Sequence, residues 1–333
     1  MIGWGIIGAG DIAERHVAPA IRDAVGHRLV AVMRRTMEGA LDFASRHQAA
    51  RAYDNVRHLL DDPEVNAVYI GTPPHVHMEE TLQAAEAGKH VLCEKPMALN
   101  STECRAMIDA CRRAGVQLAI CYYQRFNTRH QQIKRWLETG GIGRPTSALV
   151  NFAYRYRAKE GLWRHDPKIS GGGPMMDLGV HCLDLLTWLC GPVGDIQAIV
   201  DSLDPASRVE DTATLLLRMQ SGMQAVITTH WTTQGFEPEQ FNRLEIHGTE
   251  GSILAAPTFS KDSSGVLRLH RPDGIEDHSV SPGGVRPHIG LLEAFAGAVD
   301  NGGPSPIPGE AGLMHLEIIE RARQVWNSRA PRA

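Results

Sequence analysis

The chain has 333 residues, of which 43% are hydrophobic and 22% are charged. This is the ordinary mix of a globular protein, and a chain of this length can bury a large core without disulfide bonds. The composition therefore excludes a disordered protein, a collagen-like protein and a disulfide-stapled miniprotein. The formal net charge of -4, from 38 acidic and 34 basic residues, argues against attraction to nucleic acid or to an anionic membrane.

The six cysteines form no CxxC pair, and several have apolar neighbours such as Leu92, Ile120 and Leu189. This pattern predicts reduced, buried thiols. The chain opens directly into an apolar run without a basic leader, and no apolar run approaches the roughly 18 residues of a membrane span. We therefore expect a cytoplasmic protein without a membrane segment.

The first third of the chain alternates short apolar runs with helical patterns. The expected strands are 2–7, 28–33, 67–71, 90–93 and 117–121, and the expected helices are 11–25, 37–47, 75–87 and 101–114. Pro19 predicts a kink or break in the first helix. Strand–helix alternation of this kind is typical of a parallel sheet covered on both faces. Residues 1–121 are therefore predicted to form a doubly wound Rossmann domain.

The pattern changes after about residue 122. A helix at 128–139, a strand at 146–157 and a glycine-rich loop are followed by a helix at 174–189. Successive strands are expected from 193 to about 280, with a hairpin between 211–219 and 223–232, and helices are expected at 288–300 and 310–329. This order predicts a second, α+β domain at 122–333 with a large, open, mostly antiparallel sheet.

A glycine-rich turn follows the first expected strand and opens the first helix. It reads Gly8-Ala9-Gly10-Asp11-Ile12-Ala13. In a dinucleotide-binding turn the first glycine makes the tight turn, the second lets the backbone approach a pyrophosphate, and the third small residue allows close helix–strand packing. The position after the first strand of a βαβ array favours a dinucleotide site over a glycine-rich turn that binds nothing.

The end of the second expected strand bears on the choice of dinucleotide. A site for NAD usually has an acidic residue there to bind the ribose 2′-hydroxyl. This chain instead has Arg34, Arg35 and Thr36. Guanidinium groups pair well with phosphate oxygens, so the sequence favours NADP, with NAD as the alternative. The arginines are otherwise interpreted as solvated charges in an arginine-rich chain.

Two further strand ends carry candidate residues. Carboxyl ends of parallel strands bind ligands, so Gly71-Thr72-Pro73-Pro74 is predicted to contact the cofactor. His77 then enters a helix beside His75, where we expect a position facing solvent or the cofactor edge. No third ligand with suitable spacing is visible, and no metal is predicted. Lys95 follows the strand 90–93, where it would point toward the nicotinamide; the alternative is a surface charge.

The helix 174–189 carries a polar pattern of its own. Asp177, His181 and Asp184 are spaced i, i+4 and i+7, which puts them on one face of a helix. An acidic residue in the first turn and an Asp–His pair are also common in helices without a catalytic role. Together with the lysine and glycine motifs, the pattern favours a functional site.

These motifs resemble those of the glucose–fructose oxidoreductase and inositol dehydrogenase family (Gfo/Idh/MocA), over essentially the whole chain. The similarity rests on Gly8-Ala9-Gly10, Gly71-Thr72-Pro73-Pro74, Gly88-Lys89-His90-Val91-Leu92-Cys93-Glu94-Lys95-Pro96, Trp163-Arg164 before Gly171-Gly172-Gly173, the helix motif from Asp177 to Asp184, and His247-Gly248-Thr249-Glu250-Gly251.

The resemblance implies a division of labour. Lys95 from the first domain would meet Asp177 and His181 from the second at the nicotinamide. His181 would be the general acid/base and Lys95 would polarise the reacting oxygen, although Lys95 is an alternative proton carrier. Asp177 would hold a substrate hydroxyl or orient the site, and Asp184 would support His181 or serve packing.

The resemblance also implies further contacts. Glu94, His77, Trp163 and Arg164 are expected near the cofactor, with Trp163 and Arg164 also near the substrate. Tyr122 and Arg125 lie in the interdomain connection and are expected to contact the substrate, with interface packing as the alternative for Tyr122 and Tyr123. Many relatives carry Asn where Cys121 and Tyr122 stand here, so the cofactor contact at this point is an open question.

The expected function is an NADP-dependent oxidoreductase that acts on a sugar, a polyol or a related carbonyl compound. The resemblance implies a homodimer or homotetramer formed through the free face of the C-terminal sheet, because an exposed apolar face needs a partner. One alternative is a non-catalytic, NADP-binding, sugar-responsive regulator, which would be expected to lose the lysine or the histidine. Another is a sugar–sugar oxidoreductase with permanently bound NADP, against which we count the absence of an N-terminal arm before the first strand.

Overall fold

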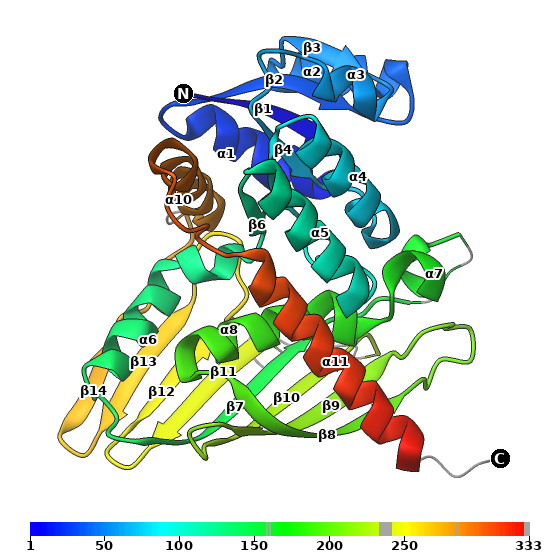
Figure 1. Ribbon diagram of the computed structural model, residues 1–333. Coiled ribbons are helices and arrows are strands. Elements are labelled where there is room, and N and C mark those ends of the chain that lie inside the picture. Colours follow the sequence, from blue (N-terminus) through cyan, green and yellow to red (C-terminus); the bar gives the residue numbers. More distant parts are fainter. Residues whose placement is uncertain (158, 160, 233–241, 284–285, 330–333) are drawn as a thin grey trace. The chain divides into compact units, whose positions relative to one another are not determined.

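A computed structural model describes residues 1–157, 159, 161–232, 242–283 and 286–329. The chain forms two compact units (Figure 1). Unit 1 comprises Met1–Tyr123 and His288–Met314, and unit 2 comprises Gln124–Pro287 and His315–Ala333. The sequence prediction assigned 288–314 to the second domain. These residues group with unit 1 through long-range contacts, such as the bridge between Pro308 and Ala119, that no local pattern reveals.

Unit 1 is built on a six-stranded sheet in the order β3-β2-β1-β4-β5-β6, and every neighbouring pair is parallel. Its strands are β1 (Ile2–Ile7), β2 (His27–Met33), β3 (Arg51–Tyr53), β4 (Ala67–Ile70), β5 (His90–Cys93) and β6 (Leu118–Ile120). The predicted Rossmann sheet is confirmed. Sequence analysis missed only β3, a three-residue edge strand of half-buried residues that lacks an apolar pattern.

The helices of unit 1 cover both faces of this sheet, with α1 and α10 on one side and α4 and α5 on the other (Figure 1). They are α1 (Ala18–Asp23), α2 (Met37–His47), α3 (Val56–Leu60), α4 (Pro74–Glu86), α5 (Ser101–Ala114) and α10 (Pro287–Asn301). The irregularity expected near Pro19 is present as a π-helical turn, η1 (Ala13–Val17), directly before α1. The five-residue α3 is too short to give a helical periodicity.

Unit 2 contains an eight-stranded sheet in the order β14-β13-β12-β11-β7-β10-β9-β8. Only β7 and β10 pair in parallel, so the predicted mostly antiparallel sheet and the β9–β10 hairpin are confirmed. The strands are β7 (Pro145–Ala153), β8 (Val193–Asp201), β9 (Thr212–Met219), β10 (Gln224–His230), β11 (Asn242–Gly248), β12 (Ser252–Ala256), β13 (Val266–Arg271) and β14 (Gly274–Asp277). Residues 233–241 of the predicted strand region lie outside the described residues.

Three helices, α6 (Thr128–Glu138), α8 (Val180–Cys190) and α11 (Gly309–Arg329), lie over one face of this sheet (Figure 1). Shorter pieces are the 3₁₀ turns η2 (Tyr123–Phe126) and η3 (Trp163–His165), the helix α7 (Pro167–Ser170) and the π-helical turn η4 (Met175–Gly179). On the other face, Leu149, Leu216 and Ile199 are 46%, 50% and 59% exposed. Unit 2 therefore has one covered and one open sheet face.

Candidate functional site

The two glycines of the glycine-rich turn in unit 1 differ in whether the fold itself requires them. Gly8 has φ +80°, and a Cβ there would lie 2.5 Å from the Thr72 side chain, so the fold itself requires glycine. Gly10 is exposed, and the nearest atom to a Cβ there is the Gly8 carbonyl oxygen at 3.9 Å. The packing does not require glycine at position 10. The open space fits the close approach of a dinucleotide pyrophosphate to the helix that begins at Asp11.

The end of β2 carries the predicted phosphate-binding residues. Arg34 is half-buried and lies over the first turn of α2, with Nη1 3.5 Å from the Gly39 carbonyl oxygen. Thr36 caps α2 by accepting a hydrogen bond from the Gly39 N–H, and Arg35 is exposed. Glu38 also lies in this first turn. A guanidinium group beside a helix N-terminus is a suitable environment for an anion.

His77 lies within the loops around the predicted cofactor site. Its ring is 1% exposed, Nε2 lies 2.7 Å from the Thr72 carbonyl oxygen, and Nδ1 lies 3.1 Å from that of Pro96. The ring thus connects the loop after β4 to the loop after β5. We expected His77 at the cofactor edge; its burial and both contacts favour a supporting role in the loops.

Glu94 fixes the backbone of Lys95. Its carboxylate accepts a hydrogen bond from the buried Tyr69 hydroxyl at 2.9 Å and from the Lys95 N–H at 3.1 Å. Lys95 is half-buried and lies two residues beyond the end of β5, which is the neighbour of β4, the strand that precedes Thr72. Unit 1 therefore brings the glycine turn, the loop after β4 and Lys95 to the carboxyl ends of three adjacent strands, which is where such sheets bind ligands.

The glycine run in unit 2 is held against the segment around Glu210. A Cβ on Gly173 would lie 1.7 Å from the Glu210 carbonyl oxygen, so the backbones approach too closely for any other residue. Arg323 of α11 donates a hydrogen bond to the Gly171 carbonyl oxygen at 2.8 Å. These contacts fix the start of η4, the π-helical turn that carries Asp177, and of α8, which carries His181 and Asp184.

Asp177 lies within a polar cluster. The Tyr154 hydroxyl donates a hydrogen bond to Asp177 Oδ2 at 2.6 Å, and Arg164 Nε lies 4.0 Å from the same oxygen. The Arg164 guanidinium lies 4.5 Å from the centre of the Trp163 ring and 5.6 Å from that of Tyr156. Unit 2 therefore brings Asp177, Arg164 and Trp163 together.

His181, one turn further along, has an aromatic environment. Its ring is buried, with its centre 6.1 Å from that of Phe152 and 6.2 Å from that of Phe259. Phe152 and Phe259 stack on each other at 4.4 Å. An imidazole beside aromatic rings is shielded from water, which suits a group that transfers a proton to a bound substrate.

Asp184 and Arg125 form a buried ion pair. Arg125 Nη2 and Nε donate to the Asp184 carboxylate at 2.6 and 3.1 Å, and His315 of α11 lies 3.9 Å from the same group. Burial raises the pKa of Asp184 to about 6 although Arg125 acts against this shift. We expected Arg125 to contact the substrate; its ion pair favours a role in fixing α8. Tyr122, another expected substrate residue, is fully buried.

Sequence analysis missed Tyr154 and Tyr156, which line the Asp177 and Arg164 cluster. A signal was present, because Phe152, Tyr154 and Tyr156 alternate at the end of the predicted strand 146–157 and so share one face of the extended chain. The strand itself ends at Ala153. From the sequence, these aromatic residues are assigned to the strand and given no role of their own.

Comparison with known proteins agrees with this geometry. A family model described as "Oxidoreductase family, NAD-binding Rossmann fold" matches residues 2–122, and one described as "GFO/IDH/MocA C-terminal domain" matches residues 130–254. The 1,5-anhydro-D-fructose reductase of Ensifer adhaerens is 33% identical over 315 residues, which cover 94% of this chain and 92% of that protein.

The chain belongs to the GFO/IDH/MocA family of oxidoreductases. Another relative, the scyllo-inositol 2-dehydrogenase (NADP(+)) of Bacillus subtilis (strain 168), is 31% identical over 300 residues, covering 89% of this chain and 83% of that protein. An aldose-aldose oxidoreductase from Caulobacter crescentus, solved in complex with glycerol, matches with a TM-score of 0.90 and 26% identity over 98% of both chains. This GFO/IDH/MocA member is therefore an NAD(P)-dependent oxidoreductase.

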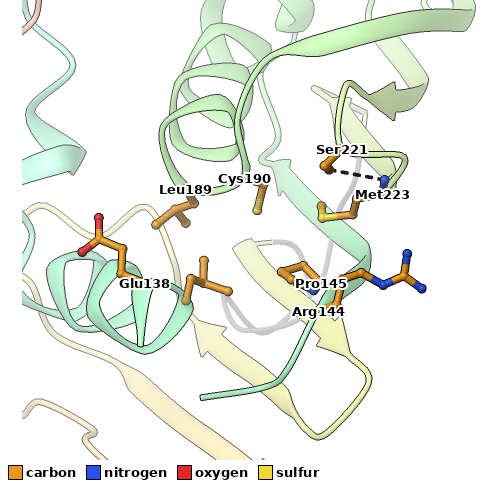
Figure 2. Close-up of a pocket in the computed structure, with 8 residues that line it drawn as sticks. Glu138, Arg144, Pro145, Leu189, Cys190, Ser221 and Met223 are labelled. Atoms are coloured by element: carbon orange, nitrogen blue, oxygen red, sulfur yellow. Dashed lines mark hydrogen bonds between the residues drawn. The ribbon is translucent and has the colours of Figure 1, made fainter. Parts of the chain in front are cut away.

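A separate cavity of about 320 Å³ lies in unit 2 of this GFO/IDH/MocA protein (Figure 2). Its lining residues are Leu137, Glu138, Arg144, Pro145, Leu189, Cys190, Ser221 and Met223. Figure 2 shows the charged groups of Glu138 and Arg144 pointing away from the other lining side chains. The cavity lies at the first residues of β7 and Tyr154 follows its last, so roughly 30 Å of strand separates them. None of the predicted site residues lines it.

Within the described ranges of this GFO/IDH/MocA member, no three His, Cys, Asp or Glu side chains gather in a way that could hold a metal ion. None of the described helices combines the length and the apolar character needed to cross a membrane.

Proposed function

We propose that the protein transfers a hydride between NADP(H) and the carbinol or carbonyl carbon of a sugar or polyol. The substrate class is supported by relatives named for 1,5-anhydro-D-fructose and scyllo-inositol. The observation that carries the proposal is the Asp177 cluster with Arg164 and Trp163, next to a buried His181. It presents a carboxylate, a guanidinium and an aromatic ring, which are groups that bind hydroxyl-rich molecules.

His181 is proposed as the general acid/base. When bound, the nicotinamide supplies or accepts the hydride. Oxidation of a carbinol carbon also requires removal of the hydroxyl proton, and reduction requires its return. An imidazole is suited to both steps near neutral pH. Lys95 would hydrogen-bond the reacting oxygen and stabilise its developing negative charge, and Glu94 fixes the Lys95 backbone for that purpose.

The preference for NADP over NAD is part of the proposal. It is supported by Arg34 over the first turn of α2 and by Arg35 beside it. The open face of Gly10 would receive the pyrophosphate, and the loop 71–74 would lie along the cofactor.

A homodimer or homotetramer formed through the open sheet face also belongs to the proposal. Leu149, Val226 and Leu216 are register partners on three adjacent strands, so they form a continuous apolar row on that face. An exposed apolar row of this kind is stabilised by a partner surface.

We propose a cytoplasmic location, supported by cysteines that are mostly buried.

A second candidate function is sugar–sugar oxidoreduction with a retained cofactor. The match to an aldose-aldose oxidoreductase favours it. The regulator alternative is disfavoured, because Lys95, Asp177 and His181 are all present.

The test is absorbance at the reduced-nicotinamide band. Purified protein is mixed with NADPH or NADH and a panel of keto-sugars, and with NADP⁺ or NAD⁺ and polyols or aldoses. Turnover faster with NADPH is the expected result. Oxidation of one sugar together with reduction of another, without added cofactor, would favour the second function. Tight cofactor binding without turnover on either panel would favour the regulator.

A further inference from the structure

The side chain that makes a short hydrogen bond with Asp177 was not among the predicted site residues. Tyr154 lies just beyond β7, and its hydroxyl donates to Asp177 Oδ2 at 2.6 Å. We propose that Tyr154 is a positioning residue for Asp177. This proposal rests on the proposed function. Its hydroxyl holds the carboxylate ionised and in one orientation, so that Asp177 receives a hydrogen bond from a substrate hydroxyl.

One carboxylate oxygen of Asp177 has a hydrogen-bond donor and a nearby guanidinium group beside it. Arg164 Nε lies 4.0 Å from the same Oδ2 that accepts the Tyr154 hydrogen bond. A hydrogen bond to an ionised acceptor is shorter and stronger than one between neutral groups. The hydrogen bond from Tyr154 defines the direction of the Asp177 carboxylate, and the hydroxyl and the nearby guanidinium both favour its charged form.

Tyr154 is held in place by backbone hydrogen bonds and by packing. The backbone of Tyr154 donates to the His230 carbonyl oxygen at 3.2 Å, and that of Tyr156 donates to the Trp231 carbonyl oxygen at 2.9 Å. These bonds continue the β7–β10 pairing beyond the end of the strand. The Tyr154 and Tyr156 rings meet edge to face at 6.2 Å and pack on the buried cluster of Leu178, Val209 and Trp231.

Arg164 has a similar support. Its guanidinium lies 4.5 Å from the centre of the Trp163 ring and 5.6 Å from that of the Tyr156 ring. A stacked guanidinium loses little further freedom when it pairs with a carboxylate. The hydroxyl and the guanidinium are therefore preorganised around Asp177.

The hydroxyl of Tyr154 stays protonated at neutral pH. Burial, and then the neighbouring charge of Asp177, raise the pKa of Tyr154 well above its usual value of 10.0. Tyr154 therefore remains a donor over the whole range in which the enzyme would work. Among the titratable groups near Asp177 are Tyr154 after β7 and Arg164 on η3, with Tyr156 beside both, and His181 lies four residues further along, in α8.

The kinetic test is a double-mutant cycle. Tyr154→Phe removes the hydroxyl and keeps the ring, and it is compared in the wild type and in Asp177→Asn, with NADPH and 1,5-anhydro-D-fructose or the panel member that gives the fastest turnover. We expect kcat/KM to fall about 10- to 100-fold in the wild-type background. In the Asp177→Asn background the same change should cost less than about 2-fold, because its target is already lost.

The matched control is Tyr53→Phe in unit 1, which deletes a similar hydroxyl–carboxylate hydrogen bond, from Tyr53 to Asp62 at 3.2 Å. It should leave kcat/KM unchanged. Equal losses from Tyr154→Phe in both backgrounds would indicate a merely structural role and overturn the inference. Wild-type kinetics in Tyr154→Phe would overturn it as well.

A second measurement needs no substrate. Protein labelled with ¹³C at aspartate carboxyl carbons is titrated by NMR, and the Asp177 signal is assigned by its loss in Asp177→Asn. Tyr154→Phe should raise the midpoint of the Asp177 titration by about one pH unit, because the charged form loses a donor. An unchanged midpoint would overturn the inference. Absent turnover with a shifted midpoint would instead count against the proposed function alone.

Discussion

The hydroxyl of Thr72 donates a hydrogen bond to the carboxyl group of Glu80 at 2.5 Å, and Glu80 is buried on α4. Burial raises the pKa of Glu80 from 4.5 to about 7, although the hydrogen bond from Thr72 acts in the opposite direction. The loop proposed to contact the cofactor therefore rests on a carboxyl group that changes charge near neutral pH.

Glu80→Gln should alter the pH dependence of stability. The folded-state pKa lies above the ordinary value, so the contribution of Glu80 is complete below about pH 4.5 and is lost as the pH rises through about 7. The free energy of unfolding of the wild type should therefore fall, relative to Glu80→Gln, by up to about 3 kcal/mol between about pH 5 and pH 8. Denaturant titrations at both pH values measure this difference. Glu86→Gln, an exposed carboxylate on the same helix, is the control, and parallel curves for wild type and Glu80→Gln would refute the prediction.

Two glycine substitutions should separate folding from cofactor binding. Gly8→Ala places a Cβ against Thr72 at a positive φ and should destabilise the protein by about 1–3 kcal/mol. Gly10→Ala meets no protein atom closer than 3.9 Å and should change stability by less than about 0.5 kcal/mol. Gly10→Ala should nevertheless weaken NADPH binding about 10-fold or more, as measured by fluorescence titration. Normal binding by a stable Gly10→Ala protein would argue against a pyrophosphate at this turn.

Arg34→Asp should shift the cofactor preference from NADPH toward NADH. The substitution removes a guanidinium suited to a phosphate and supplies a carboxylate suited to ribose hydroxyls. The ratio of kcat/KM for the two cofactors should fall by about 10-fold or more. The exposed Arg22→Asp, on α1, is the control. An unchanged ratio in Arg34→Asp would leave that arginine as a surface charge.

His181→Ala should slow the chemical step by about 10²–10⁴ while leaving NADPH binding nearly intact. Single-turnover kinetics and a separate binding titration distinguish the two effects. Lys95→Met provides the comparison. The rate of the chemical step is measured as a function of pH in both variants. If Lys95→Met abolishes its dependence on pH and His181→Ala does not, Lys95 is the proton carrier. Lost cofactor binding in His181→Ala would contradict its proposed role.

Much of this architecture could be predicted from the sequence. The strands β1 and β5 and the helices α2 and α5 have the predicted bounds, because each has a clear apolar period and a definite end. The strand β3 could not be predicted because its three residues are half-buried and lack an apolar run, unlike the equally short β6. The helix α3 could not be predicted because five residues are too few to show a helical period. The grouping of residues 288–314 with unit 1 could not be predicted either, because their contacts with that unit join distant parts of the chain.

The contacts of the candidate site residues could be predicted only in part, because they also join distant parts of the chain. Motifs that are local in the sequence made Lys95, Asp177 and His181 candidates for the site. The partners of a side chain depend on tertiary packing, and here the sequence was less informative. Arg125 was expected at the substrate and instead forms an ion pair with Asp184. Tyr154 was not a candidate, yet it donates to Asp177.

The most direct test of the central claim is hydride transfer itself. The protein is incubated with NADPH deuterated at the nicotinamide C4 position and with the keto-sugar panel, and the products are analysed by mass spectrometry and NMR. We predict one deuterium on the newly formed carbinol carbon, from one face of the nicotinamide only. Deuterium retained in the nicotinamide, with no labelled carbinol from any panel member despite bound cofactor, would contradict the account.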